Sequence, residues 1–104
     1  MLVLTRKIGE SIHIGDYIME LLEVQRDSVK ISLTGKFSQQ IISLSLRQEV
    51  IIDKDKTISF FVNRICYSCN LRLGYAQFCI KAPRSIRIMR SELLIAPRQN
   101  IKEP

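Results

Sequence analysis

The residues most able to do chemistry in this chain are cations at the ends of alternating, strand-like segments. Arg6 and Lys7 close an N-terminal segment that begins Met1-Leu2-Val3-Leu4-Thr5, and Arg84 and Arg90 flank a second such segment near the C-terminus. Cations on exposed strands contact phosphates, and the counterions they displace make binding depend on salt. Alternatively, they are solvated charges that keep edge strands from aggregating. The pattern indicates either a nucleic-acid interface or a solvated edge.

The net charge of +6 belongs to the second half of the chain. Residues up to Glu49 include six basic and six acidic side chains, whereas those from Val50 onward include ten basic and four acidic ones. A basic surface attracts polyanions, although solubility alone is a competing explanation. The distribution favours a partner that carries phosphates.

Three cysteines, Cys66, Cys69 and Cys79, are an odd number and form no disulfide framework, which favours a reducing cytoplasm. Cys66 and Cys69 have C-x-x-C spacing, but there is no second ligand pair, and the single histidine, His13, is remote in sequence. On an alternating strand, residues 66 and 69 point to opposite faces, which suits neither zinc nor a redox pair. We therefore expect no metal or other cofactor, and thiols that fill the core.

No constellation of residues supports an enzyme or a small-molecule substrate. The chain has one histidine, no glycine-rich phosphate loop and no nucleophile motif. Its 104 residues suffice for one compact body, and no apolar run approaches the roughly 18 residues of a membrane span. The early alternation, with Glu10 soon after it, is typical of a mature fold rather than of a leader. We expect a soluble, cytoplasmic binding protein.

Short strands separated by turns account for almost the whole chain. Such a pattern is typical of an all-β sandwich or barrel. A short helix is expected only over 90–96, where Ser91 is a candidate N-cap and Pro97 ends the helix. The ten predicted strands span 2–7, 11–14, 18–25, 28–33, 41–46, 50–52, 57–62, 65–70, 76–80 and 85–89.

A faint internal repeat indicates that the chain is doubled. Leu46-Arg47-Gln48-Glu49-Val50 and Met89-Arg90-Ser91-Glu92-Leu93 share the pattern apolar-Arg-polar-Glu-apolar at an offset of 43 residues. Five predicted strands precede the end of each copy. The pattern predicts a duplicated five-strand unit, with a chance likeness between two β-rich stretches as the alternative.

Two motifs at the extremities of the chain carry a family resemblance. One is the opening from Met1 to Ser11 with Ile14-Gly15-Asp16 after it, and the other runs from Lys81-Ala82-Pro83-Arg84 through an alternating strand to Arg90-Ser91-Glu92. Both resemble motifs of the carbon storage regulator family (CsrA, also RsmA), small bacterial RNA-binding proteins that control translation. The second motif lies about one family-length too late for a single unit.

Two arrangements explain that displacement: one family domain with a long central insertion, or two domains in tandem. Residues 1–49 nearly complete the family pattern, because Val29 to Leu33 resembles its fourth strand and Ile42 to Glu49 its fifth. We therefore favour a first copy over 1–49, which lacks the Ala-Pro turn, and a second over 50–104, which has a poor first strand. Family members are interleaved homodimers, so the resemblance implies two five-strand units intertwined as a single-chain pseudo-dimer.

The resemblance also implies where RNA would bind. In the family, each site joins the first strand of one subunit to the fifth strand of the other. One such pairing is intact here, whereas the reciprocal one joins Ile51, Ile52, Asp53 and Lys54 to Arg47 and has an acid where the family keeps a base. We expect one working site and one decayed site. The implied RNA-binding residues are Leu4, Thr5, Arg6, Lys7, Ala82, Pro83, Arg84, Ile86, Ile88 and Arg90.

The implied ligand is single-stranded GGA, usually in a hairpin loop of an mRNA or a small regulatory RNA. Leu4 and Ile88 would form an apolar bed beneath the bases, and Arg90 would fork hydrogen bonds to a phosphate or a guanine. From alternation alone, Leu4 and Ile88 are equally well core residues. The aromatic residues offer no stacking platform and are expected in the core or between the copies: Tyr17, Phe37, Phe60, Phe61, Tyr67, Tyr75 and Phe78.

A second function stays open, namely a divergent paralogue that sequesters a CsrA-type subunit or its protein regulator and binds little RNA. The poor first strand of the second copy favours it. The intact opening from Leu4 to Lys7 and the turn from Ala82 to Arg84 argue against it, because a pure decoy needs neither.

Overall fold

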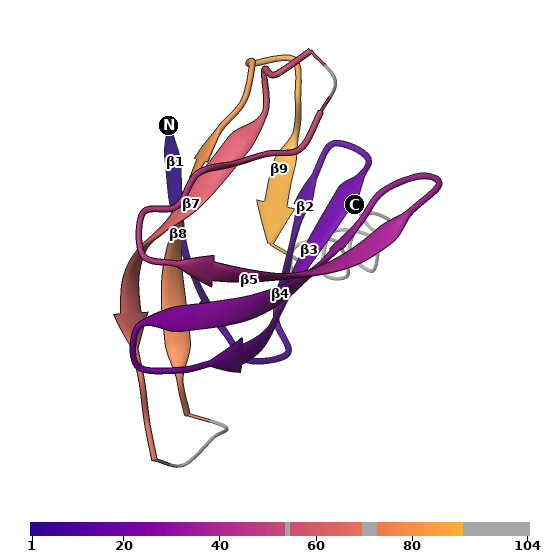
Figure 1. Cartoon of the computed structure of the whole chain (residues 1–104). Helices are drawn as coiled ribbons and strands as arrows, with labels where there is room; N and C mark the ends of the chain where they lie inside the picture. Colours follow the sequence, from indigo (N-terminus) through magenta and orange to yellow (C-terminus); the bar gives the residue numbers. More distant parts are fainter. Residues whose placement is uncertain (54, 70–72, 91–104) are drawn as a thin grey trace, which may run out of the picture.

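The computed structural model describes residues 1–53, 55–69 and 73–90, which form two antiparallel β-sheets packed face to face (Figure 1). The four-stranded sheet has the order β1-β8-β7-β6, and the five-stranded sheet has the order β5-β4-β3-β2-β9. No described residue is helical, and the sheets do not close into a barrel. The all-β prediction is confirmed. The strands are β1 (Leu2–Lys7), β2 (Ser11–Ile14), β3 (Tyr17–Val24), β4 (Ser28–Thr34), β5 (Gln39–Ser45), β6 (Val50–Ile51), β7 (Ser59–Cys66), β8 (Tyr75–Lys81) and β9 (Ile88–Arg90).

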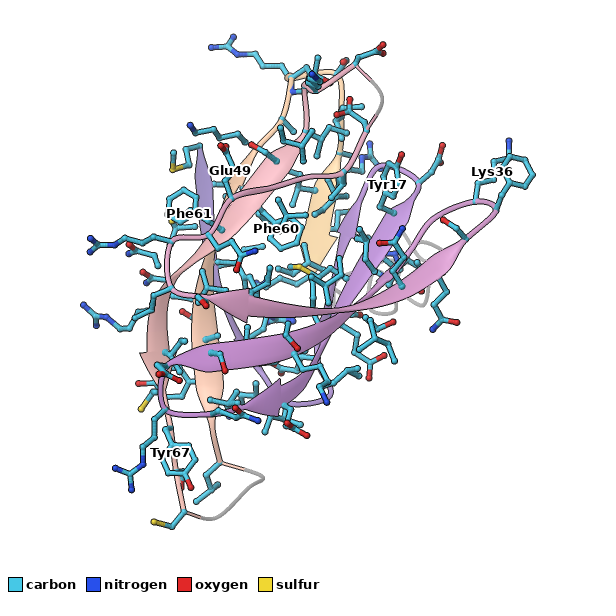
Figure 2. All side chains as sticks on the ribbon, in the orientation of Figure 1. Tyr17, Lys36, Glu49, Phe60, Phe61 and Tyr67 are labelled. Carbon is cyan, nitrogen blue, oxygen red and sulfur yellow. The ribbon has the colours of Figure 1, made fainter. Side chains whose placement is uncertain are left out.

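Period-two alternation places one face of each sheet in a common core. On β2, Ile12 and Ile14 are fully buried, and on β8 the same is true of Phe78 and Ile80. Phe60 of β7 points between the sheets (Figure 2) and meets Phe78 edge to face, with ring centroids 6.3 Å apart. Such an aromatic pair contributes about 0.5–1.5 kcal/mol of stability beyond what burial of its surface area provides. Because one buried cluster draws on both sheets, the sandwich is a single body.

Strands far apart in the sequence pair with each other in both sheets. β1 pairs with β8, where Leu4 lies opposite Phe78, and β9 pairs with β2, where His13 lies opposite Met89. The first strand of the chain therefore completes a sheet of later strands, and the last described strand completes a sheet of earlier ones. Early and late strands thus alternate between the sheets, while the division of the chain into two units stays a prediction.

Three connections carry the chain between the sheets, and one of them, 82–87, leads from β8 into β9. β1, an edge of the four-stranded sheet, leads through 8–10 into β2, and β5, an edge of the five-stranded sheet, leads through 46–49 into β6. β9 lies beyond β2, whereas no strand among the described residues lies beyond β6. The sandwich thus has a β1/β9 side, bounded by those two edge strands, and an opposite β5/β6 side.

The turn after β1 depends on a glycine. Gly9 has φ 91°, in the left-handed region that favours glycine, and its N–H donates to the carbonyl of Leu21 at 2.8 Å. Glu10 N donates to Lys7 O at 3.0 Å, and Lys7 N donates to Glu10 Oε1 at 2.8 Å. These bonds fix the direction in which the chain leaves β1.

The turn after β5 has the same geometry with different residues. Arg47 has φ 62°, and its N–H donates to the carbonyl of Val62 at 2.8 Å. Gln48 N donates to Ser45 O at 3.2 Å, and Ser45 N donates to Gln48 Oε1 at 3.1 Å. A bulge is also repeated, because the register shifts between Leu21 and Glu23 in the β3–β4 pair and between Val62 and Arg64 in the β7–β8 pair.

Several predicted boundaries need correction. The predicted strands 57–62 and 65–70 are one strand, β7, because the bulge absorbs a residue without a turn. β5 begins at Gln39, two residues before the predicted start. The last strand begins at Ile88 rather than at 85, because Ile86 N donates to Pro83 O at 3.0 Å and closes a turn there. The predicted helix over 90–96 lies outside the described residues, apart from Arg90, which ends β9.

Candidate nucleic-acid interface

The residues implied as an RNA site lie on two edge strands and on the segment before one of them. Leu4, Thr5, Arg6 and Lys7 lie on β1, the outer strand of the four-stranded sheet. The remaining predicted residues precede or belong to β9, the outer strand of the five-stranded sheet: Ala82, Pro83, Arg84, Ile86, Ile88 and Arg90.

Short connections hold these two groups on one side of the sandwich. β1 passes through 8–10 into β2, the neighbour of β9, and β8, the neighbour of β1, passes through 82–87 into β9. Gly15 N donates to Arg87 O at 2.8 Å, and a Cβ added to Gly15 would lie 3.3 Å from Cγ2 of Ile86. The segment before β9 therefore lies tightly against the turn that joins β2 to β3.

Arg6 is a buried cation with protein partners, unlike its exposed neighbour Lys7. Its side chain is 5% exposed; Nε donates to Thr5 O at 2.9 Å and Nη1 donates to Ser11 O at 3.3 Å. Nη2 lies 3.7 Å from Glu10 Oε1. A buried guanidinium needs such partners, because an unpaired buried charge is costly. On β1, Lys7 is therefore the cation exposed to solvent, whereas the charge of Arg6 is fixed beneath the edge.

The segment from Ala82 to Arg90 presents cations on a partly buried apolar base. Ile86 and Ile88 are half-buried and, like Leu4 of β1, pack against the core. Arg84 is exposed in the turn before them. Exposed cations beside a half-buried apolar surface can contact the phosphates of a nucleic acid while its bases lie against the aliphatic side chains.

Two more exposed cations, which were not predicted as site residues, border the same segment. Lys81 ends β8 and Arg87 directly precedes β9. The alternation of apolar and polar residues predicts that both are exposed. Lys81 follows fully buried Ile80, and Arg87 stands between the half-buried Ile86 and Ile88. Applying the two-residue period of a strand to the basic residues of this segment would have identified both as exposed cations.

The described residues of β5 and β6 include no cation, and Arg47, in the turn between these strands, shares a pocket with Lys81 from the end of β8. β5 has the sequence Gln-Gln-Ile-Ile-Ser-Leu-Ser and contains no charged residue. Arg47 is exposed in the turn after β5 and borders a pocket of about 260 Å³ together with Glu49, Phe61 and Lys81. The only charged residues in the turn itself are Arg47 and Glu49, whose charges cancel.

Asp53, the acid expected where the family keeps a base, has a structural role in the turn between β6 and β7. Its carboxylate accepts hydrogen bonds from the hydroxyl of Thr57 and from the N–H groups of Thr57, at 2.9 Å, and Ile58, at 3.0 Å. The Thr57 hydroxyl first, and then these backbone donors, lower the pKa of Asp53 from its ordinary value, because they stabilise the ionised form. Lys54, the next residue, lies outside the described residues.

The cysteines differ in their burial. Cys79 is buried, Cys66 is half-buried and Cys69 is exposed, and all three are free thiols. The core-filling prediction is thus confirmed for Cys79 and wrong for Cys69. The described part of the chain assembles no group of three or more His, Cys, Asp or Glu side chains that would hold a metal ion.

The aromatic residues also differ in their burial, and Tyr17, Phe61 and Tyr75 are half-buried. Phe60 and Phe78 are fully buried, as predicted. Phe37 is 92% exposed and Tyr67 is 39% exposed, so the core prediction is wrong for both. Each ring lies beside a cation, Phe37 beside Lys36 and Tyr67 beside Arg26.

Comparisons with known proteins identify the family. The model of the CsrA global regulator protein family matches residues 1–55. The chain is also 38% identical over 66 residues to the translational regulator CsrA of Thermosipho melanesiensis, an alignment that covers 62% of this chain and 88% of that protein. No solved structure matches the chain significantly. The chain belongs to the CsrA family.

The family match extends from β1 through β6 and ends before β7. The candidate site residues on β1 therefore lie within the matched region. Those of 82–90 lie beyond it, and only the structure relates their position to β1. The described residues include no helix long and apolar enough to cross a membrane.

Proposed function

We propose that this protein is a cytoplasmic, RNA-binding post-transcriptional regulator that recognises unpaired GGA, preferably in a hairpin loop, and controls the translation or stability of mRNA. Family membership supports the general activity. One observation carries the proposal: β1 and the segment 82–90 lie on the same side of the sandwich, where Lys7, Arg84 and Arg87 are exposed.

The chemistry of this side suits unpaired RNA. The outermost strand of a sheet offers backbone N–H and C=O groups that can pair with the Watson–Crick edges of splayed bases. Leu4 and Ile88 are half-buried and offer apolar contact to the rings. Exposed cations then fix the backbone in register through its phosphates.

We also propose that the chain is a duplicated unit whose boundary precedes β5 rather than follows it. The turn after β5 repeats the turn after β1, and the β7–β8 bulge repeats the β3–β4 bulge. The registers agree, since Leu4 faces Phe78 in the β1–β8 pair and Ile42 faces Ile31 in the β5–β4 pair. On this reading β5 holds the place of a first strand, and the units span 1–38 and 39–104.

This boundary explains why one chain would carry one site. β6 follows β5 as β2 follows β1, yet β2 pairs with β9 and β6 has no such second partner among the described residues. The first unit then supplies no fifth strand, and β5 supplies no cations. We therefore place a single GGA site on the β1/β9 side.

A gel-shift titration tests the proposed ligand. The probe is a hairpin with GGA in its loop, and the control is the same hairpin with those bases changed to CCU. We expect binding to the GGA hairpin to be tighter by about tenfold or more, because each lost base contact costs about 1–3 kcal/mol. Equal affinity for both RNAs would reduce the interaction to nonspecific phosphate binding and would refute the proposal.

The outer edge of β6 favours one alternative function, capture of a strand from a CsrA-type subunit. Ile52 N donates to Ile58 O at 3.0 Å, so the backbone groups of Ile51 point the other way, towards the outer edge. The Ile51 side chain is 51% exposed. Co-expression with a CsrA subunit and measurement of the mass of the purified complex tests this function, and separate elution of the two proteins would exclude it.

A further inference from the structure

A pocket at the tip of the β4–β5 hairpin has no part in the site described above. It has a volume of about 400 Å³ and is lined by Asp16, Tyr17, Gly35, Lys36, Phe37 and Ser38. The ring of Phe37 is 92% exposed, and Nζ of Lys36 lies 5.7 Å from its centroid. Leaving a phenyl ring in water forfeits the stabilisation that burial would bring. An exposed aromatic ring beside a cation can stack with an unpaired base whose phosphate the cation contacts.

The hairpin tip is held firmly enough to present that ring. Gly35 N donates to Ser38 O at 2.8 Å and closes the turn. A Cβ on Gly35 would lie 3.2 Å from Cε1 of Tyr17, so the Tyr17 ring packs directly against the hairpin backbone. Lys36 stands at the outer end of this hairpin, and Tyr17 belongs to the neighbouring hairpin (Figure 2).

The pocket adjoins the proposed RNA interface through the turn that joins β2 to β3. Gly15 contacts the segment before β9, through Ile86 and the carbonyl of Arg87. The next residue, Asp16, lines the pocket. An RNA strand that leaves the β1/β9 side over this turn therefore arrives at Phe37.

We propose that this pocket binds one unpaired base flanking the GGA element, with a preference for guanine; the inference rests on the proposed RNA-binding function. The base stacks on Phe37, and Lys36 neutralises the adjoining phosphate. The Asp16 carboxylate accepts hydrogen bonds from N1–H and the N2 amino group of guanine, two donors that adenine does not place together on that edge. Stacking of a single base on an aromatic side chain strengthens binding by about tenfold.

The test compares two RNAs, a GGA hairpin without overhangs and the same hairpin with single-stranded tails that each contain one guanine. The parent protein should bind the tailed RNA about tenfold more tightly. Phe37→Ala should abolish this gain and leave affinity for the hairpin without tails unchanged, whereas Phe37→Tyr should retain it. Tyr67→Ala is the matched control, because the Tyr67 ring also lies beside a cation, 5.3 Å from Cζ of Arg26, but at the opposite end of the molecule (Figure 2).

Two further readouts make the result decisive. The fluorescence of 2-aminopurine placed in a tail should be quenched by the parent protein and not by Phe37→Ala. Asp16→Asn should remove the preference for a guanine over an adenine in the tail while stacking persists. If the hairpin binds but Phe37→Ala keeps the full gain from the tails, the pocket inference is wrong and the proposed function stands. If the parent protein binds neither RNA, both are wrong.

Discussion

The two sides of the sandwich share a backbone plan and differ in their chemistry. β1 and β5 each end in a turn with a left-handed residue, Gly9 or Arg47, whose N–H donates to a carbonyl of the other sheet. β1 ends in Arg6-Lys7, whereas β5 ends in Leu44-Ser45. Backbone hydrogen bonds and buried apolar side chains hold the fold, so the polar side chains at an edge are free to diverge.

Arg6 of β1 and Leu44 of β5 occupy matching positions and show how the two sides differ in chemistry. Arg6 lies opposite Ala76 in the β1–β8 pair, Leu44 lies opposite Val29 in the β5–β4 pair, and both are buried. A hydrophobic side chain can replace a buried ionic group without loss of stability. The fold therefore does not require a cation at this position, and Arg6 instead has hydrogen-bond partners that offset the cost of burying its charge.

The largest predicted effects concern the core that both sides share. Phe78→Ala in the four-stranded sheet should lower the free energy of unfolding by about 3–5 kcal/mol, and Ile31→Ala in the five-stranded sheet by about 2–5 kcal/mol, because each leaves a cavity. Denaturant titration followed by circular dichroism should show one transition in each variant. Two separate transitions would mean that the sheets fold independently and that the two sides are not parts of one body.

The next prediction separates the two sides by RNA binding. Arg90→Ala should weaken binding of a GGA hairpin by about 1–3 kcal/mol if its guanidinium makes a bidentate contact. Arg47→Ala should change binding little, because the strands on its side, β5 and β6, include no cation among the described residues. Calorimetric titration of both variants, each shown to be folded, makes the comparison. Equal losses would mean that both sides bind RNA.

Sequence was sufficient where side-chain type and spacing determine structure. The opening from Met1 to Ser11 identified the family and the β1 edge, and alternation placed Phe78 and Ile80 in the core. The continuous β7 was missed, because a bulge leaves no turn residue in the sequence. The exposure of Phe37 was missed as well, because composition does not distinguish a hairpin tip from a core position.

The place of β5 was the least predictable feature of the fold. Gln39 to Ser45 lacks the cations that mark β1, and Arg47 occupies a left-handed position, where a glycine would be expected. The likeness between the two segments lies in their pairing register and turn hydrogen bonds, which are properties of the folded chain. The family resemblance predicts a fifth strand at this segment, whereas the proposed duplication makes it a first strand.

The smallest predicted effect is on salt dependence. Lys7→Ala should reduce the slope of log affinity against log salt concentration by about 1, since one phosphate contact is lost. Ser45→Lys, which adds a cation at the matching position of β5, should leave the slope unchanged because no second edge strand completes that side among the described residues. Binding measured across a salt series decides this, and a steeper slope for Ser45→Lys would show that RNA also reaches β5.

The central claim is that a single chain forms one RNA site on its β1/β9 side. Native mass spectrometry of the parent protein, titrated with a GGA hairpin at micromolar concentration, measures both the number of chains and the number of RNAs in each complex. We predict one chain with one hairpin, and no further uptake when the RNA is in moderate excess. Two hairpins bound with equal affinity to one chain, or one hairpin bound only by a pair of chains, would contradict the account.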